Sequence, residues 1–212
     1  MLMETERLKL IITFILIYLS WDAYALAYPF IGQWSVNTLP YFLRLPLTSY
    51  SFEYSLVSWT VSHQCLHTLM RLIYNSSFSG SMFLTFLCSL PDKGLSKRLI
   101  RRYLLIFLIL AVSFALFHIY APHYVYHLPE RYMPNNILTP PQFVFPSPHC
   151  AIAFVSLLTI WEKRNPLMIF LRVYLLLVPV STVLLGEHWI WDVIAALFIA
   201  LFAIKIEMGL RH

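Results

Sequence analysis

Long apolar runs separated by short polar or basic stretches dominate the chain. The runs cover residues 10–31, 66–90, 103–120, 149–161, 166–185 and 188–206. A helix of roughly 20 apolar residues is long enough to cross a bilayer. We therefore predict an all-α fold, a polytopic membrane bundle of six transmembrane helices. No internal repeat or soluble domain is visible, so residues 1–212 are expected to form a single integral-membrane domain.

The first apolar run is the one with an alternative interpretation. It begins after Lys9 and ends near Pro29, and Ala23-Tyr24-Ala25 within it has the small-x-small form of a signal-peptide cleavage site. Apolar character resumes from Leu26 to Ile31. We therefore expect an uncleaved first span and keep a cleaved signal peptide as the alternative.

The segment of residues 33–65 is too interrupted to be a span. It is aromatic and rich in Ser and Thr, and it contains Pro40, Arg44, Pro46 and Glu53. No stretch in it reaches the apolar length that a crossing needs. We predict an interfacial or re-entrant helical segment between the first and second spans.

Charge supports this topology. Only 12% of the residues are charged and 59% are hydrophobic, whereas about a quarter of a soluble domain is charged. The net charge of +5 comes from basic residues that cluster between apolar runs: Lys93, Lys97, Arg98, Arg101, Arg102, Lys163 and Arg164. This is the pattern of cytoplasmic loops in membrane proteins. We expect the lipid bilayer, and no nucleic acid, as a partner.

The most informative polar residues are His188 and Asp192, four positions apart within an apolar run. Such residues face the same side of a helix, and an ionisable pair inside a membrane is by default a hypothesis about function. His149 stands about forty residues upstream, at the start of the fourth span. With both termini inside, the six-span topology brings residues 33–65 and 122–148 to the same face as these three side chains.

These residue types suit phosphoryl chemistry. Asp192 would orient the imidazole of His188, whose free ring nitrogen would attack phosphorus. His149 would protonate the departing oxygen and then activate the acceptor. Ser147 and the amides at the start of the fourth span would hold an anion, since a helix N-terminus is an anion site.

Two motifs resemble those of the type 2 phosphatidic acid phosphatase superfamily over about residues 66–206. Pro146-Ser147-Pro148-His149 resembles P-S-G-H, and Ser181-Thr182 with His188 and Asp192 resembles S-R-x5-H-x3-D. The resemblance implies that His188 forms a phospho-histidine, that Asp192 is its partner and that His149 is the acid. It also implies that Ser147 and Ser181 bind phosphate, that the substrate is a phosphorylated lipid, and that neither a metal nor a cofactor is required.

Three departures from the family pattern concern phosphate binding. The family's K-x6-R-P motif is missing near the end of the third span, where the chain reads Tyr120-Ala121-Pro122-His123. Thr182 replaces the Arg of the third motif, and Pro148 replaces the Gly of the second. The chain is most similar to the branch that resembles inositol phosphorylceramide synthase, which transfers phosphoryl groups between lipids. The candidate replacement cations are Arg131, Arg71, His123 and His127.

Two other functions stay open. The spacing of His123 and His127 would suit a zinc-dependent membrane hydrolase that also uses His149, His188 or Asp192. A non-catalytic lipid-binding relic of the fold is the other alternative. The sequence identifies neither the lipid, nor water or an alcohol as acceptor, nor a protein partner. We expect a multi-pass protein of a bacterial inner membrane or an endomembrane, with its site on the extracytoplasmic or lumenal side.

Overall fold

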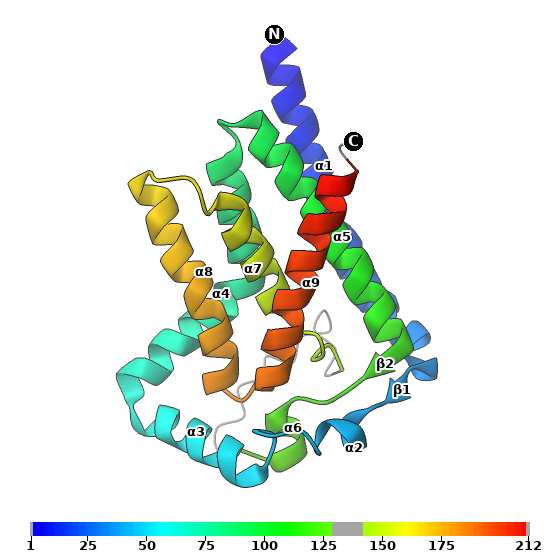
Figure 1. Cartoon of the computed structure of the whole chain (residues 1–212), viewed down its shortest axis with the longest axis vertical. Helices are drawn as coiled ribbons and strands as arrows, with labels where there is room; N and C mark the ends of the chain where they lie inside the picture. The colour runs from blue at the N-terminus through cyan, green and yellow to red at the C-terminus, as the bar shows by residue number, and fades with distance from the viewer. Residues whose placement is uncertain (1, 129–141, 211–212) are drawn as a thin grey trace.

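The computed structural model describes residues 2–128 and 142–210 and is all-α, as predicted (Figure 1). The elements are α1 (Leu2–Ile31), η1 (Gly32–Trp34), β1 (Val36–Asn37), α2 (Leu39–Phe42), α3 (Tyr50–Ser62), α4 (Gln64–Ser89), α5 (Lys93–Leu116), β2 (Phe117–His118), α6 (Pro122–Tyr126), α7 (Pro148–Ile160), α8 (Pro166–Leu184) and α9 (Ile190–Gly209). The two short strands pair in parallel, with Val36 opposite Phe117.

Each predicted span overlaps one helix, namely α1, α4, α5, α7, α8 and α9. Among the described residues, three stretches are both long and apolar enough to cross a membrane: Glu4–Trp34, Lys93–Leu116 and Pro166–Leu184. The helix α7 is apolar but has only 13 residues. These helices indicate a membrane protein, and the six-span topology stays a prediction.

The third long helix begins earlier than the apolar pattern predicts. We expected residues 91–102 to form a basic loop, but α5 starts at Lys93. Asp92 is its N-cap, and its Oδ1 accepts a hydrogen bond of 3.0 Å from the amide of Leu95. Its Oδ2 lies 2.8 Å from Nζ of Lys163 in the α7–α8 loop. A side-chain cap thus extends the helix into the basic stretch.

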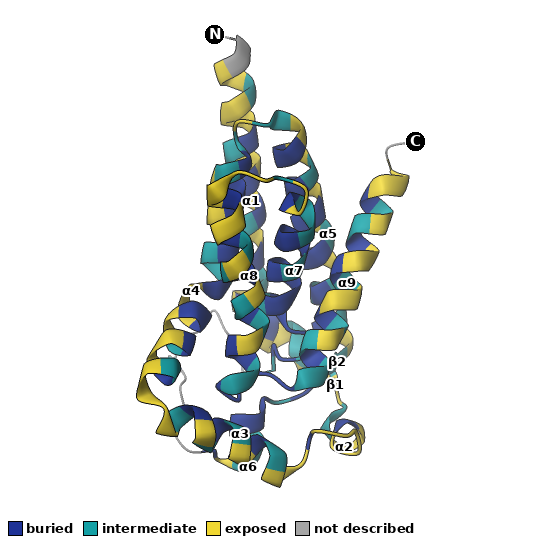
Figure 2. Ribbon diagram, turned by 60° about the vertical axis from the view of Figure 1, so that its left-hand side comes forward, coloured by how far each residue is buried: buried dark blue, intermediate teal, exposed yellow. Residues whose placement is uncertain are grey.

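The helical segment predicted between the first two spans is present as α2 and α3. Ser49 caps α3, because its Oγ accepts a hydrogen bond of 3.4 Å from the amide of Phe52. Glu53, Val57 and Thr60 are buried and follow helical spacing. Figure 2 shows that α3 turns its buried side toward the bundle, whose end it crosses.

The helix α7 occupies the centre of the bundle. It packs against α4, α5, α8 and α9, and Ala151, Ile152, Ala153 and Val155 along it are completely buried. A helix that is apolar on all sides is expected in such a central place, and small residues let neighbouring helices approach closely. The start of α7 is therefore held inside the bundle.

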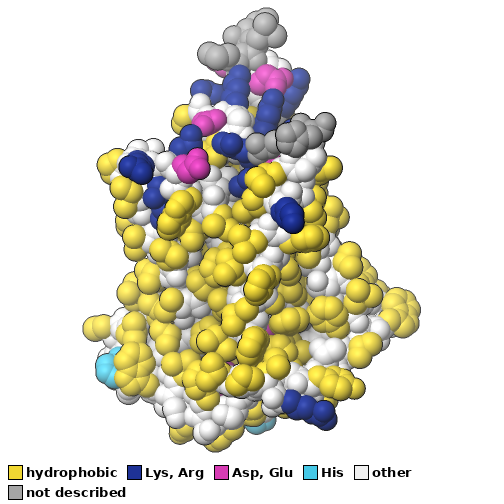
Figure 3. Space-filling model, viewed as in Figure 1, with side chains coloured by type: hydrophobic (Ala, Val, Ile, Leu, Met, Phe, Trp, Pro, Cys, Tyr) yellow, Lys and Arg dark blue, Asp and Glu magenta, His cyan; other side chains and the backbone are white. Residues whose placement is uncertain are grey.

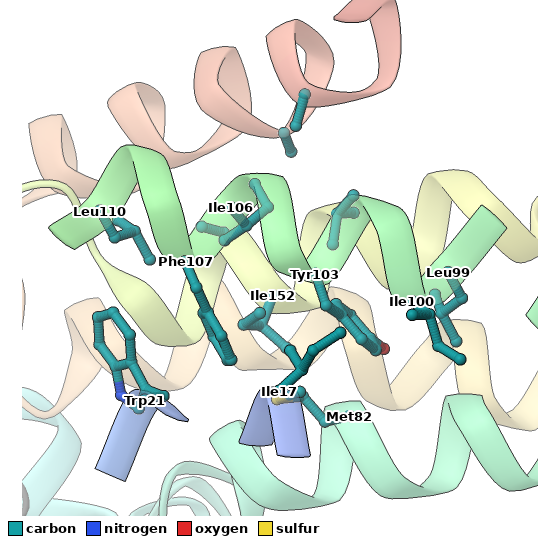
Figure 4. Close-up of a cluster of buried hydrophobic side chains, with 14 of the residues drawn as sticks. Ile17, Trp21, Met82, Leu99, Ile100, Tyr103, Ile106, Phe107, Leu110 and Ile152 are labelled. Atoms are coloured by element: carbon teal, nitrogen blue, oxygen red, sulfur yellow. The ribbon is translucent and has the colours of Figure 1, made fainter. Parts of the chain in front are cut away.

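Aliphatic and aromatic side chains fill the space between α1, α4, α5 and α7 (Figure 4). The rings of Trp21 and Phe107 stack with centroids 4.9 Å apart, and those of Phe14 and Phe86 stack at 4.1 Å. The hydroxyl of Tyr103 shares a hydrogen bond of 2.7 Å with Ser156, which connects α5 to α7. These contacts fix the long helices beside the central one.

The two ends of the bundle differ in charge. Lys and Arg side chains gather at the end that carries both termini, and hydrophobic side chains cover the middle (Figure 3). The opposite end carries α2, α3 and α6 (Figure 1). Each end therefore presents a different chemistry, as the loop charges predicted.

A buried ion pair connects α5 to α9. Nη2 of Arg102 lies 3.3 Å from Oε2 of Glu207, whose side chain is fully buried. Nη1 of Arg102 donates a hydrogen bond of 2.8 Å to Thr159 of α7. Three helices thus meet at one guanidinium group.

We predict that Glu207→Ala lowers the free energy of unfolding by about 3 kcal/mol, because it removes the carboxylate partner of a buried charge. Unfolding of the purified protein in detergent micelles measures the loss. Arg101→Ala is the control, since Arg101 is exposed and lies 3.9 Å from the same carboxyl group. It should cost less than about 1 kcal/mol. Equal losses in the two variants would contradict this role for the buried pair.

Candidate active site

Three residues predicted as catalytic meet at the end of the bundle that carries α3 and α6. His149 lies in the first turn of α7, His188 in the loop between α8 and α9, and Asp192 in the first turn of α9. The rings of His149 and His188 are 5.7 Å apart between centroids and inclined at 61°. They are close enough to flank one phosphoryl group.

A tight turn after α8 places His188. The carbonyl of Thr182 accepts hydrogen bonds from the amides of Glu187 at 3.0 Å and His188 at 3.2 Å. Gly186, between them and the helix, has a φ of +67°. Only glycine adopts this left-handed conformation without steric cost. The turn directs His188 into the bundle, where its side chain is 3% exposed.

Asp192 connects the start of α9 to the imidazole. Its Oδ2 accepts a hydrogen bond of 2.8 Å from the amide of Trp189, which precedes the helix. The same oxygen lies 3.3 Å from Nδ1 of His188. Trp189 is itself buried, and its Nε1 donates to the carbonyl of Tyr120 at 2.8 Å. The carboxylate is therefore fixed by the helix start that it caps.

A backbone carbonyl completes the orientation of His188. Nδ1 of the ring lies 3.0 Å from the carbonyl oxygen of Val144 as well as near Asp192. Since both are acceptors, we assign the proton to Nδ1, which leaves the lone pair on Nε2. The side chain of His188 is buried, and burial disfavours the charged form of an imidazole. The ring is thus neutral, as a nucleophile must be.

The start of α7 brings the second histidine into place. Ser147 is the N-cap, with its Oγ accepting a hydrogen bond of 3.3 Å from the amide of Cys150. Its own amide donates to the backbone carbonyl of Asp192 at 3.4 Å. The ring of His149 packs against Tyr74 of α4, with centroids 4.9 Å apart. The predicted phosphate ligand Ser147 thus lies between the two helices of the site.

The other predicted ligand from the third motif is engaged within α8. The hydroxyl of Ser181 is buried and donates to the carbonyl of Val178 at 2.7 Å. The hydroxyl of Thr182 donates to the carbonyl of Pro179 at 2.9 Å and lies 3.4 Å from Sγ of Cys150. Thr182 therefore fills a contact between α8 and α7, where the family pattern has a cationic side chain.

The four candidate cations have different surroundings. Arg131 lies outside the described residues. His127 is exposed and has a φ of 49°. Arg71 lies on α4 one turn before Tyr74. His123, on α6, is buried with 2% exposure.

His123 forms a second buried pair with Glu187. Its Nδ1 donates a hydrogen bond of 2.9 Å to the carbonyl of Gly186 and lies 3.6 Å from Oε2 of Glu187. Both side chains are 2% exposed. His123 was a candidate from the sequence, whereas its pairing with Glu187 becomes visible only in the structure.

Metal ligation was the alternative for the histidines. Within residues 2–128 and 142–210, no three His, Cys, Asp or Glu side chains are arranged to hold a metal ion. The proposed zinc pair His123 and His127 has one buried and one exposed member. The alternative therefore gains no support from this arrangement.

Sequence reasoning did not identify Glu53 as a site residue. Its side chain is fully buried on α3, and among the described residues neither carboxyl oxygen has a hydrogen-bond partner. Burial raises the pKa of Glu53 to about 8. The available signal was its spacing from Val57 and Thr60, which places an acid on the inward face of an amphipathic helix.

Comparison with protein families gives one match. The family model described as the PAP2 superfamily matches residues 47–206. The match begins just before α3 and contains His149, His188 and Asp192. Comparisons with curated proteins and with solved structures gave no significant match. The predicted superfamily is confirmed, whereas its inositol phosphorylceramide synthase-like branch stays a prediction.

We predict that Gly186→Ala lowers the free energy of unfolding by about 1 to 2 kcal/mol because of its positive φ. An added Cβ would also lie 3.0 Å from side chains of Leu128 and Val57. Gly209→Ala is the matched control, since a Cβ there meets nothing within 4 Å. Denaturant unfolding in micelles compares the two variants. A Gly186 variant as stable as the Gly209 variant would contradict the strained turn.

We predict that Glu53 makes stability fall as pH rises. Its folded-state pKa of about 8 exceeds the usual value of about 4.3. Between these values the unfolded chain releases the proton and the folded chain retains it, so unfolding becomes more favourable with each pH step. Glu53→Gln should therefore reduce the decline in unfolding temperature between pH 5 and pH 8, measured in micelles. Parallel curves for the two proteins would refute the prediction.

Proposed function

Because the chain belongs to the PAP2 superfamily, we propose that it is an integral membrane enzyme that removes or transfers the phosphoryl group of a phosphorylated lipid. The observation that carries this proposal is the meeting of His149 from α7, His188 from the α8–α9 loop and Asp192 from α9. Their ring and carboxyl groups form a nucleophile, its orienting partner and an acid within one buried site.

The first step forms a covalent intermediate. Nε2 of His188 attacks phosphorus, so that an N–P bond forms while the P–O bond to the lipid breaks. His149 begins this step as an imidazolium, donates its proton to the departing oxygen and is left neutral. Asp192 lies beside Nδ1 of His188 and stabilises the positive charge that develops on the ring.

The second step reverses these roles. An oxygen nucleophile attacks the phospho-histidine, His149 accepts its proton, and the N–P bond breaks to restore neutral His188. Water as the acceptor makes the enzyme a phosphatase, and a lipid or sugar hydroxyl makes it a phosphotransferase. Thr182 in place of the family's Arg favours the transferase branch, since it removes a cation that serves phosphate binding.

The site faces the extracytoplasmic or lumenal side in this proposal. Basic residues gather at the end with both termini (Figure 3), and such residues stay in the cytoplasm. The start of α7, with His149, and the start of α9, which His188 precedes, lie toward the opposite end, where Figure 1 shows α3 and α6. Six spans with both termini inside are consistent with that arrangement.

We predict that His188→Ala and Asp192→Asn lower turnover on the order of 10³-fold or more while the protein still folds. Purified protein is incubated with lipids that carry a radiolabelled phosphoryl group, and free phosphate, new lipids and acid-labile label on the protein are measured. His63→Gln is the control, because His63 is exposed at the end of α3.

Each outcome separates the alternatives. Product and labelled protein from the wild type, both lost in the His188 variant, support the proposal. Activity that a chelator abolishes, together with bound zinc, would instead support the metal hydrolase. Neither product nor label from any lipid would indicate a non-catalytic relic. Wild-type activity in the His188 variant would overturn the phospho-histidine mechanism.

A further inference from the structure

The inward face of α3 holds a carboxyl group that the phospho-histidine mechanism does not use. Glu53 is fully buried, and among the described residues neither of its oxygens has a hydrogen-bond partner. An unpaired buried charge is very costly, so such a group is neutral or awaits a partner. Its presence therefore needs an explanation.

Glu53 is placed beside the turn that carries His188. The helix α3 packs against α4, α6 and α8. Val57, one turn beyond Glu53, adjoins Gly186, where an added Cβ would lie 3.0 Å from Cγ2 of Val57. The carbonyl of Gly186 in turn holds His123.

Glu53 also interacts electrostatically with groups of α6 and of the site. Burial, and next the charge of Glu53, raise the pKa of Tyr126 on α6. The charges of Glu53 and Asp192 also interact. Titratable groups on the adjoining parts of the packed elements are His67 and Arg71 on α4, His123 and Tyr126 on α6, and Glu187 and His188 after α8.

Glu53 and His123 have the chemistry of phosphate ligands. A protonated carboxyl group is a neutral hydrogen-bond donor, and phosphoryl oxygens are acceptors. An imidazole beside a carboxylate is stabilised in its charged form, and Nδ1 of His123 lies 3.6 Å from Glu187. Phosphoryl transfer needs such donors around the equatorial oxygens.

We propose that Glu53 and His123 bind the phosphoryl group in place of the missing K-x6-R-P cations. Glu53 acts as a protonated acid that donates a hydrogen bond, and His123 acts as a cation that Glu187 supports. This inference rests on the proposed function, since it names the phosphate ligands of that same site. It assigns α3 and α6 to substrate binding.

The consequence is that phosphate affinity depends on pH. With a pKa of about 8, the protonated fraction of Glu53 falls from about nine tenths at pH 7 to about one tenth at pH 9, and apparent affinity falls with it. The carboxylate that results also repels the anion. A site built from Lys and Arg would not change in this range, because both stay charged.

Tungstate binding tests the inference without turnover. The charge of this phosphate mimic does not change between pH 7 and pH 9. Titration calorimetry of the full chain in micelles should give an affinity about tenfold weaker at pH 9 than at pH 7. Glu53→Gln keeps a donor that cannot ionise, so its affinity should fall less than that of the wild type over the same range, and the fall that remains would come from loss of the proton on His123.

The second pair of variants tests His123. His123→Gln should weaken binding about tenfold or more at pH 7, because a charged donor is lost. His123→Lys restores a cation and should recover part of that affinity, which a purely structural role would not do. His63→Gln, at the exposed end of α3, is the control.

The result that would overturn the inference is a wild-type affinity independent of pH together with unchanged binding by Glu53→Gln and His123→Gln. Labelled phospho-histidine in that same protein would leave the proposed function intact. Absence of both tungstate binding and label from the wild type would remove the proposed function, and this inference with it. If the His123 variants do not fold, the pH series of the wild type and Glu53→Gln still decides the role of Glu53.

Discussion

One carboxylate oxygen of Asp192 connects the start of α9 to His188, the proposed nucleophile. Oδ2 of Asp192 caps the amide of Trp189 and lies beside Nδ1 of His188. Inside an apolar bundle there is no water to satisfy these groups, so the start of α9 and the position of the imidazole depend on the same contact. The backbone carbonyl of Asp192 also accepts from Ser147. The contacts that cap the start of α9 therefore also position the start of α7 and the imidazole of His188.

The central position of α7 restricts the movement of its first turn, which carries His149. Its apolar surface is buried on all sides by α4, α5, α8 and α9, so it has little freedom to slide or rotate. His149 in its first turn therefore keeps a fixed distance from His188. Catalysis by two histidines requires such alignment, because misplacement of an acid by about 1 Å costs on the order of 10²-fold in rate. The buried pair of Arg102 and Glu207 fastens the other ends of α5 and α9.

The sequence allowed the helices to be predicted, and it identified three candidate catalytic residues that the fold brings together, because both leave local patterns. Apolar runs marked every long helix, and the spacing of His188 and Asp192 placed them on one side of a helix start. The predicted start of α5 was wrong, because the N-cap at Asp92 begins the helix before the apolar run. The contact of the Val144 carbonyl with His188 and the place of Glu53 beside the site could not be predicted, for a different reason. A backbone carbonyl carries no side-chain signal, and a buried acid on a short helix gains its meaning only when tertiary packing brings α3 over the site.

The packing around Thr182 connects the departures from the family pattern to each other. Its hydroxyl contacts Cys150 at the start of α7, so this position now serves the interface between α7 and α8. A larger cationic side chain would have to displace that contact. In the proposed function, the positive charge that binds the phosphoryl group must then come from another element. The buried His123 of α6, which lies beside Glu187, is the group that we propose. In the site that we propose, Thr182 in place of Arg and the missing K-x6-R-P motif go together, because the phosphate-binding groups are titratable side chains on α3 and α6 instead of permanent charges on the spans.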